Sequence, residues 1–266
     1  MKHMKYRIRI TYTLELTQPT RTLTLTTAIP QTTWRQRALL KEPKEAKLKC
    51  MGSNRILELT ARSIPEGVHE FKLELEVEAR ASRAKVGGVS YEELKAEGRY
   101  LASSPLVEAD SPEIAEAAKK AASEAKSPFE AAQAAASWVY ENLEYDIAYA
   151  PTSESALTVL KARRGTCDEF AHLTIALCRA LGIPARYVLG YLEAKGELGP
   201  HAWVEVYMGK WKWIPVDPTP ETPPTLGCLS GSHIKLATAE DHSKVPRASA
   251  ITAPSKALSN ISSKVE

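Results

Sequence analysis

The first third of the chain alternates apolar and polar side chains. Large apolar residues occupy every even position from 6 to 16, with Lys, Arg, Thr or Glu between them, and "FKLELEVEAR" at 71–80 repeats the pattern. A period of two over about ten residues predicts β-strands that bury one face. The segments "TLTLTTAI" and "RILELTA" predict weaker strands between these two. Residues 1–82 are therefore expected to form an antiparallel β-domain with one solvated face.

Helical patterns follow a break at "AKVGGVS", which we expect to open a linker over residues 83–109. Segment 110–125 begins with Asp-Ser-Pro, and segment 127–143 begins with Ser-Pro and carries Glu130 three residues after its first serine. Proline in the first turn and a Ser-x-x-Glu capping box both mark the start of a helix. A shorter helix is expected through "SALTVLKARR".

Strand patterns return in the last third of the chain, in "ARYVLGYLE", "HAWVEVYM" and "KWKWIPVDPT". The chain is thus expected to be an α+β protein in which residues 110–246 form a second domain of helices packed on an antiparallel sheet. Segment 247–266 is rich in Ser, Ala and Lys and poor in large apolar side chains, so we expect a mobile C-terminal tail.

Charge and cysteine content narrow the class of protein. The chain of 266 residues has a formal net charge of +3 and no dense basic run, so we expect no nucleic-acid partner. Its first residues form no continuous apolar stretch, so we expect neither a signal peptide nor a membrane partner. Four cysteines without a Cys-x-x-Cys pair predict no zinc site and no disulfide framework. These features predict a cytoplasmic protein with reduced thiols, no metal and no organic cofactor.

Cys167 stands at the start of a predicted helix. Gly165 and Thr166 precede it, a helical apolar pattern follows it, and Gly182 and Pro184 end that pattern. A thiol in the first turn faces the positive end of the helix dipole and unpaired backbone N–H groups. Both features favour the thiolate, and the N–H groups can also bind an oxyanion. The alternative is a buried structural cysteine, because free cysteine is among the most buried residue types.

The segment after residue 200 is predicted to form a β-hairpin that supplies a base and an acid. With a loop at residues 208–210, His201 lies directly opposite Asp217, and both share the odd-numbered face with three tryptophans and a glutamate. The even-numbered face is apolar and is expected to pack on the helices. Side chains directly across a strand pair lie about 5 Å apart at Cβ, which suits a carboxylate that orients an imidazole. Cys167, His201 and Asp217 thus provide a nucleophile, a base and an orienting group for thiol catalysis.

These motifs resemble the catalytic core of the transglutaminase-like superfamily, which is related in layout to papain-type cysteine proteases. The resemblance is carried by "RRGTCDEFAHLTIALCRALGIPARYVLGYL", "HAWVEVY" and "WIPVDPTP", in that order, within residues 127–246. It implies a papain-like fold in which the family's catalytic cysteine, histidine and aspartate correspond to Cys167, His201 and Asp217. The later "GSHIKLATAEDHSKVP" is similar to the segment that follows the aspartate in prokaryotic members. One departure is Asp168, because close prokaryotic relatives frequently have glutamine there.

Several other side chains have simpler interpretations. Cys178 and His172 lie further along the helix of the candidate nucleophile and are interpreted as a core residue and a packed or hydrogen-bonded residue. His233 and His242 follow the candidate aspartate and could support the site without a catalytic role. The three tryptophans of the hairpin could line a substrate wall or pack in the core. A second oxyanion donor is left unassigned.

The triad implies an enzyme that forms a thioester between Cys167 and the carbonyl of a protein or peptide amide. His201 takes the thiol proton and returns it to the leaving amine, while Asp217 fixes the histidine tautomer. An amine acceptor gives transglutamination, and water gives hydrolysis by a cysteine protease or amidase. A peptide N-glycanase is a further variant, although the zinc-binding Cys-x-x-Cys pairs common in that family are missing from this sequence. The non-enzymatic alternative is a catalytically silent binding scaffold.

Overall fold

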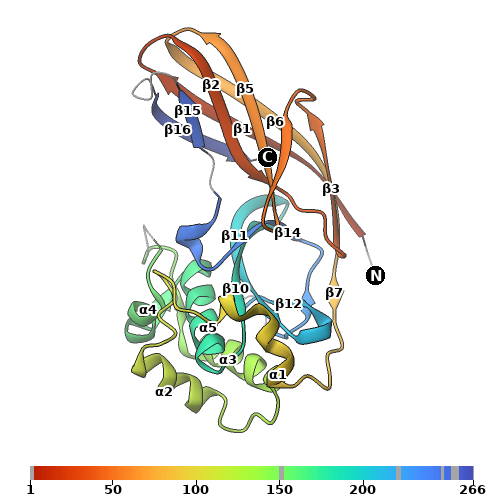
Figure 1. Cartoon of the computed structure of the whole chain (residues 1–266), viewed down its shortest axis with the longest axis vertical. Helices are drawn as coiled ribbons and strands as arrows, with labels where there is room; N and C mark the ends of the chain where they lie inside the picture. The colour runs from red at the N-terminus through yellow and green to blue at the C-terminus, as the bar shows by residue number, and fades with distance from the viewer. Residues whose placement is uncertain (1–2, 150–152, 220–222, 247–248, 253–257, 266) are drawn as a thin grey trace.

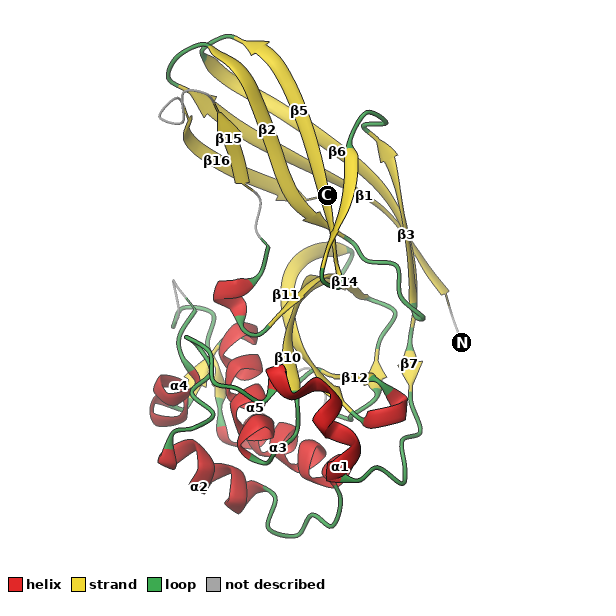
Figure 2. Cartoon of the chain, viewed as in Figure 1, coloured by secondary structure: helices red, strands yellow, loops and turns green. Residues whose placement is uncertain are grey.

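A β-sandwich stands above a layer of helices and a second antiparallel sheet (Figures 1 and 2), which confirms the expected α+β fold. The computed structural model describes residues 3–149, 153–219, 223–246, 249–252 and 258–265. The two parts of the molecule meet where the sandwich reaches the edge of the second sheet. The candidate site lies in the second part, within a layer of strands and helices.

The sandwich consists of two four-stranded antiparallel sheets. Its strands are β1 (His3–Leu16), β2 (Thr20–Ile29), β3 (Gln36–Glu42), β4 (Lys47–Met51), β5 (Asn54–Ile64), β6 (Gly67–Arg80), β15 (Ser249–Thr252) and β16 (Leu258–Val265). One sheet has the order β16-β1-β6-β3 and the other β15-β2-β5-β4. The even-numbered apolar residues of β1 from Ile8 to Leu16 are buried, as the alternation predicts. The Tyr12 hydroxyl and Thr27 Oγ1, 2.7 Å apart, join the two sheets by a hydrogen bond.

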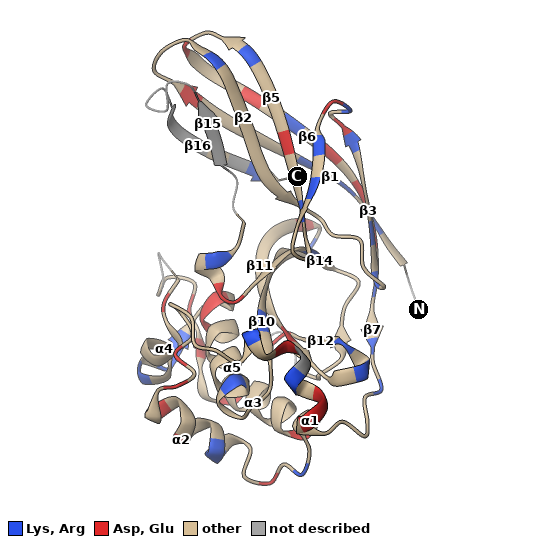
Figure 3. Cartoon of the chain, viewed as in Figure 1, with Lys and Arg blue, Asp and Glu red and all other residues tan. Residues whose placement is uncertain are grey.

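Charged residues of both signs occur along β1 and β6 (Figure 3), where they alternate with buried apolar residues. Ion pairs cross between neighbouring strands at 2.9–3.1 Å: Lys5 with Glu78, Arg9 with Glu74, and Lys41 with Glu76. Exposed pairs of this kind contribute little to stability, but alternating charges discourage edge-to-edge association of strands. The polar half of the alternating pattern is therefore the solvated face.

The C-terminal segment 247–266 is not the mobile tail that its composition suggests. Residues 249–252 pair with β2, and residues 258–265 pair with β1, so this segment completes both sheets of the sandwich. The expectation was wrong because it considered side chains alone, whereas an edge strand is held largely by backbone hydrogen bonds to its neighbour. Residues 247–248, 253–257 and 266 of that segment lie outside the described residues.

The second part of the molecule packs helices on one face of an antiparallel sheet. Its helices are α2 (Pro112–Ala121), α3 (Pro128–Asn142), α4 (Ala156–Ala162) and α5 (Cys167–Ala180), and its sheet contains β10 (Ala185–Ala194), β11 (Glu197–Tyr207), β12 (Trp213–Val216) and β14 (His233–Ala239) in the order β12-β11-β10-β14. α5 is central, with α2, α3 and α4 on one side and β10 and β11 on the other. Within the described ranges, no helix is long and apolar enough to cross a bilayer.

The segment expected to be a linker, residues 83–109, is largely folded onto this second part. Its irregular stretch at 84–90 agrees with the break in the pattern, but α1 (Tyr91–Leu94) and the 3-10 helix η1 (Lys95–Tyr100) follow directly. Leu94 and Tyr100 are buried against the core. Just before it, β7 (Ser82–Arg83) pairs with β13 (Cys228–Leu229). The expectation missed these elements because they are one turn or two residues long.

Two amide side chains of the sandwich pair with the backbone of β14. Asn54 Oδ1 accepts from the Thr238 N–H at 2.8 Å, and its Nδ2 donates to the Thr238 carbonyl at 2.9 Å. Gln36 Oε1 accepts from the Lys235 N–H at 2.7 Å, and its Nε2 donates to the Lys235 carbonyl at 2.9 Å. Each amide thus satisfies both backbone groups of one residue, as a neighbouring strand would. The free edge of β14 is thereby docked to the sandwich.

A buried cluster of charges lies beside this contact. Both Arg186 and Lys235 reach the carboxylate of Glu205 at 2.7 Å, and all three side chains are buried. Burial raises the pKa of Glu205, but the charges of Lys235 and Arg186 outweigh that effect and lower the pKa to about 2. Burial lowers the pKa of Lys235 to about 8, against the attraction of Glu205. At neutral pH Glu205 is therefore a carboxylate, and Lys235 is mainly protonated.

Replacing Glu205 should destabilise the fold in a pH-dependent way. Glu205→Gln leaves two buried cations without a carboxylate, so we expect a loss of about 3–5 kcal/mol in the free energy of unfolding at pH 7. The pKa of Glu205 is lowered from 4.5 to about 2 in the folded protein, so its stabilisation is complete above pH 4.5 and is lost as the pH falls toward 2. Urea unfolding should show the gap between wild type and variant closing over that range.

The control for this experiment is Glu76→Gln, which removes an exposed carboxylate paired with Lys41. It should leave the unfolding free energy nearly unchanged at every pH, because exposed ion pairs contribute little. A Glu205→Gln gap that stays constant from neutral pH to acid would contradict the assigned charge state.

Candidate active site

Helix α5 begins at Cys167, as predicted, and its first turn is fixed by a capping box that the sequence reasoning did not identify. Glu169 Oε2 accepts from the backbone N–H of Thr166 at 2.8 Å and from its hydroxyl at 2.7 Å. A Cβ on Gly165 would lie 2.3 Å from the Cβ of Glu169, so only glycine fits before this turn. The Cys167 thiol therefore sits at a rigid helix N-terminus, where backbone N–H groups have no intrahelical acceptor.

The hairpin that carries His201 and Asp217 has a longer loop than predicted. Val204 pairs with Val216, and Tyr207 pairs with Trp213, so Asp217 lies two positions away from the residue that would face His201 directly. The predicted register was wrong because a 3-10 turn, η2 (Gly209–Trp211), extends the loop. A shift of two residues preserves the face of every side chain, so the odd-numbered side chains of the hairpin still share one face.

His201 and Asp217 nevertheless form the predicted hydrogen bond. Nε2 of His201 lies 2.7 Å from Oδ2 of Asp217, and the imidazole is almost completely buried. Directly opposite His201 on β10 is Gly190, whose missing side chain leaves room for the indole of Trp203. A Cβ on Gly190 would lie 2.4 Å from that indole. The indole stacks with the His201 ring at 6.2 Å between ring centroids, which fixes the plane of the imidazole.

Asp217 accepts four hydrogen bonds, two on each oxygen. Oδ1 accepts from the backbone N–H of Thr219 at 3.1 Å and from its hydroxyl at 2.8 Å. Oδ2 accepts from His201 and also from Nε2 of His233 at 2.9 Å. Burial raises the pKa of Asp217, but the hydrogen bonds from the two histidines outweigh burial and lower the pKa well below its usual range. Asp217 is therefore ionised at neutral pH.

The environment of His201 favours its charged form. Burial lowers the pKa of His201, but hydrogen bonds with Asp217 and Cys167 outweigh burial and raise the pKa to about 10. Because Nε2 is bound to Asp217, Nδ1 is the ring nitrogen left for the thiol. The charged imidazole, with Nδ1 free of Asp217, is thus placed to interact with the Cys167 sulfur.

His233 was expected to have at most a supporting role, and the structure shows that it binds Asp217 directly. Its Nδ1 lies 2.8 Å from the Ser230 hydroxyl, and its Nε2 donates to Asp217. Burial lowers the pKa of His233, so this imidazole is neutral, with its proton on Nε2 and its Nδ1 accepting from Ser230. One carboxylate thus holds one charged and one neutral imidazole. No motif in the sequence pointed to Ser230 or to Thr219.

Asp168, which departs from the family pattern, is a buried anchor next to Cys167. It accepts from the hydroxyl of Tyr187 at 2.5 Å and from that of Ser153 at 2.8 Å, and one of its oxygens lies 3.1 Å from Nδ1 of His242. These contacts outweigh burial and lower the pKa of Asp168 below its usual range. The His242 ring stacks on Tyr187. Asp168 therefore ties the start of α5 to β10 and to the segment after β14.

The two simpler interpretations on α5 agree with the structure. His172 is buried, with Nδ1 donating to the Glu154 carbonyl at 2.9 Å and Nε2 accepting from the His242 N–H at 3.3 Å. Burial lowers the pKa of His172, which keeps the ring neutral. Cys178 is buried in the core, and burial raises the pKa of Cys178 to about 12, so its thiol stays protonated.

One group among the described residues has the composition of a metal site: His201, Asp217 and His233, whose donor atoms lie within 4.8 Å of one another. The two nitrogens lie 2.7 and 2.9 Å from the same oxygen. Donor atoms around a tetrahedral zinc ion are roughly 3.3 Å apart, because each lies about 2.0 Å from the metal. The observed distances are those of N–H···O hydrogen bonds, so these side chains fit a hydrogen-bonded network better than a metal ion.

Comparison with known proteins identifies the core. Residues 115–218 match the model of the Transglutaminase-like superfamily, so this part of the chain is a transglutaminase-like core, and the resemblance seen in the sequence is confirmed. An uncharacterized protein of Mycobacterium leprae is 39% identical over 100 residues, which cover 35% of each chain. A protein-glutamine gamma-glutamyltransferase of Pseudomonas aeruginosa is 39% identical over 74 residues, which cover 23% of this chain and 11% of that protein. The chain thus spans well under half of these relatives' length.

The fold of the whole chain also has a solved counterpart. The crystal structure of a candidate cysteine protease from Cytophaga hutchinsonii matches it with a TM-score of 0.65 and 22% sequence identity, covering 100% of this chain and 92% of that chain. At this identity the likeness concerns the fold alone. It includes the sandwich as well as the core, so the arrangement of the two parts is not peculiar to this sequence.

Asp217→Asn should keep the fold and lower turnover by about ten-thousandfold, as the same substitution does at the aspartate of a Ser-His-Asp triad. The asparagine amide can donate to Nε2 of His201, which would place the imidazole proton on Nδ1 and so on the side of the thiol. Steady-state kinetics and a melting curve check the two parts of this expectation. Undiminished turnover would show that Asp217 does not orient a catalytic histidine.

His233→Ala should lower turnover by roughly tenfold to a hundredfold, which corresponds to one hydrogen bond to a charged group. His233 touches Asp217 rather than the thiol, so it acts as a positioning residue. His233→Gln, which keeps an N–H donor, should recover part of the loss. Equal losses in both variants, with unchanged melting temperatures, would contradict a role through the hydrogen bond.

Proposed function

We propose that the chain is a thiol-dependent enzyme that transfers acyl groups from protein or peptide amides. In this proposal Cys167 is the nucleophile, His201 is the general base and acid, and Asp217 orients His201. The observation that carries the proposal is the position of the imidazole, which is bound to Asp217 through Nε2 at 2.7 Å and interacts electrostatically with Cys167 at the start of α5. This is the nucleophile–base–orienter arrangement of covalent acyl transfer.

The proposed reaction passes through a thioester. The thiol proton of Cys167 first passes to Nδ1 of His201, which forms the charged imidazole, and the Cys167 sulfur then attacks the amide carbonyl carbon. Backbone N–H groups of the first turn of α5 stabilise the oxyanion that forms. The C–N bond then breaks, His201 gives its proton to the leaving amine, and the acyl group remains on sulfur. An acceptor attacks the thioester and loses its proton to His201, which returns it to the thiolate.

The acceptor decides the outcome of the second half of this reaction. A primary amine gives transamidation, for which the similarity to a protein-glutamine gamma-glutamyltransferase of Pseudomonas aeruginosa is the supporting observation. Water gives hydrolysis of the same thioester, and the chain would then act as a cysteine protease or amidase. Both outcomes use the same three side chains, so the proposal covers both and the experiment separates them.

A catalytically silent scaffold is the competing proposal, and the intact triad argues against it. A scaffold would not need His201 and Asp217 to keep a buried hydrogen bond beside a thiol. The location of the protein belongs to the proposal too, because the reaction needs a reduced thiol, and all four cysteines are free in the structure. A reducing, cytoplasmic environment is therefore the expected setting.

A single experiment tests the reaction class. The full chain is incubated with casein, a glutamine-containing protein, with and without a primary amine such as putrescine, and the products are mapped by mass spectrometry. Attachment of the amine to glutamine side chains supports transfer, whereas deamidated glutamines or new peptide termini support hydrolysis. Both should disappear after alkylation of the thiol. If neither casein nor any protein of a panel of unrelated substrates is modified, the result would favour the scaffold.

Cys167→Ala should abolish turnover and leave the fold intact, because the thiol is the nucleophile and lies at the edge of the core. Cys178→Ala is the matched control on the same helix: it truncates a fully buried side chain and should cost about 1–3 kcal/mol of stability while turnover persists. Kinetics and urea unfolding of both variants check the pair of expectations. A Cys167→Ala variant with wild-type turnover would refute the assigned nucleophile.

A further inference from the structure

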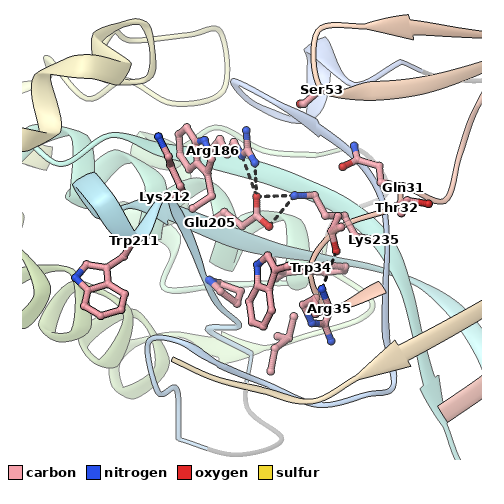
Figure 4. A pocket seen from close by; sticks show the side chains of 15 residues that line it. Gln31, Thr32, Trp34, Arg35, Ser53, Arg186, Glu205, Trp211, Lys212 and Lys235 are labelled. Atoms are coloured by element: carbon pink, nitrogen blue, oxygen red, sulfur yellow. Dashed lines mark hydrogen bonds and ion pairs between the residues drawn. The ribbon is translucent and has the colours of Figure 1, made fainter. Parts of the chain in front are cut away.

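A cavity lies where the sandwich meets the sheet of the core. It has a volume of about 400 Å³, and its walls come from residues 31–35 and Ser53 of the sandwich and from β10, β11, β12 and β14 (Figure 4). Four of the chain's five tryptophans line it: Trp34, Trp203, Trp211 and Trp213. We refer to it as the tryptophan cavity. Its size is in the usual range for small-ligand sites.

The tryptophan cavity has an excess of positive charge. Four cationic side chains and one carboxylate, that of Glu205, line it. Arg186 and Lys235 are paired with Glu205, which lies between them in Figure 4. The other two cations, Arg35 and Lys212, have no carboxylate partner within the described part of the chain. An anion in the cavity would therefore meet two cations that form no ion pair with a described carboxylate.

Two buried hydrogen-bond donors in the lining have no partner. Among the described residues, four buried side-chain polar atoms lack a hydrogen bond, and two of them are Arg35 Nε and Trp203 Nε1. Arg35 is 7% exposed and Trp203 is 0% exposed. The terminal nitrogens of Arg35 are already occupied by the carbonyls of Ser230 and His233. A buried donor without an acceptor is costly, so an acceptor supplied by a ligand would be favoured.

We propose that the tryptophan cavity binds a carboxylate-bearing ligand with an aromatic or aliphatic body. Arg35, Lys212 and the indole N–H of Trp203 face the carboxylate, and the other indole rings surround the apolar body. A carboxylate is a compact anion whose oxygens accept charge-assisted hydrogen bonds from guanidinium and ammonium groups and also from an indole N–H. The carboxylate belongs either to a free small molecule or to an acidic residue of a peptide, and both present the same chemistry to the cavity.

The proposed site adjoins the catalytic one without sharing its reacting groups. The Trp203 ring that lines the cavity stacks with His201 at 6.2 Å. Arg35 holds the carbonyl of His233, whose side chain binds Asp217. A ligand in the cavity thus contacts the residues that position the triad. Binding itself does not depend on whether Cys167 is catalytic, so it can be tested separately from the proposed function.

The first test compares a carboxylate with its neutral amide. Calorimetric titration of the full chain with N-acetyl-phenylalanine and with N-acetyl-phenylalanine amide measures the contribution of the carboxylate directly. We expect the acid to bind at least about tenfold more tightly than the amide. Equal affinities, or no binding of the acid up to about 10 mM, would overturn the proposal.

The second test assigns the residues. Arg35→Gln and Lys212→Ala should each reduce the preference for the acid over the amide, whereas Trp34→Ala should weaken both probes alike. Lys212 and Trp34 are exposed at the surface, so Lys212→Ala and Trp34→Ala should keep the fold. These two variants still test the assignment if Arg35→Gln destabilises the protein. Lys119→Ala on α2 is the charge-matched control and should change nothing. An acid preference that is unchanged in both cation variants would overturn the assignment.

The third test distinguishes the two sources of the carboxylate. The peptide acetyl-Phe-Glu-Phe-amide and its glutamine counterpart are titrated into the full-length Cys167→Ala variant, so that turnover cannot mimic binding. Tighter binding of the glutamate peptide supports an acidic residue of a peptide as the ligand. Binding of N-acetyl-phenylalanine without that peptide preference supports a free small carboxylate. Loss of acid preference for every probe would overturn the proposal, whatever the activity of the wild-type chain.

Discussion

The carboxylate of Asp217 is the group on which the geometry of the site depends. It accepts two hydrogen bonds from Thr219 in its own loop, one from His201 on β11 and one from His233 on β14. Its negative charge holds His201 in the charged form, while burial keeps His233 neutral. Without it, two buried imidazoles would lose their partner at once, and His201 would lose the hydrogen bond that directs its other ring nitrogen toward Cys167.

The sandwich contributes to this network although it supplies none of the proposed triad. Gln36 and Asn54 dock the edge of β14, and Arg35 holds the carbonyls of Ser230 and His233. β14 begins at His233, so the position of the second imidazole depends on contacts made by the N-terminal domain. The same contacts enclose the tryptophan cavity. The domain is therefore part of the support of the site and should not be separable from it without changing the site.

The sequence predicted those features that depend on local pattern. Alternation along β1 predicted its buried face, and the residues around Cys167 predicted the start of α5. In the hairpin, the face on which a side chain lies was predicted more reliably than its partner across the strands. The loop is two residues longer than expected, but His201 and Asp217 still form a hydrogen bond, because side chains alternate between faces with a period of two.

Features that depend on distant contacts were not predictable in this way. The C-terminal strands are specified by backbone pairing with β1 and β2, which leaves no hydrophobic signal in a short edge strand. The pairing of Gln36 with Lys235 joins residues 199 positions apart, and the local sequence around each residue does not predict it. Ser230, Thr219 and the role of His233 are hidden for the same reason. The chain must be folded before these side chains become neighbours.

The measurement that tests the central claim most directly is the rate at which iodoacetamide modifies each cysteine, followed by peptide mass spectrometry. At about pH 6 an ordinary thiol with a pKa of about 8.5 is almost entirely protonated and reacts slowly. If His201 and the start of α5 activate Cys167, it should react well ahead of the exposed Cys50, and His201→Ala should remove that advantage. A Cys167 that reacts no faster than Cys50, or at the same rate without His201, would contradict the account.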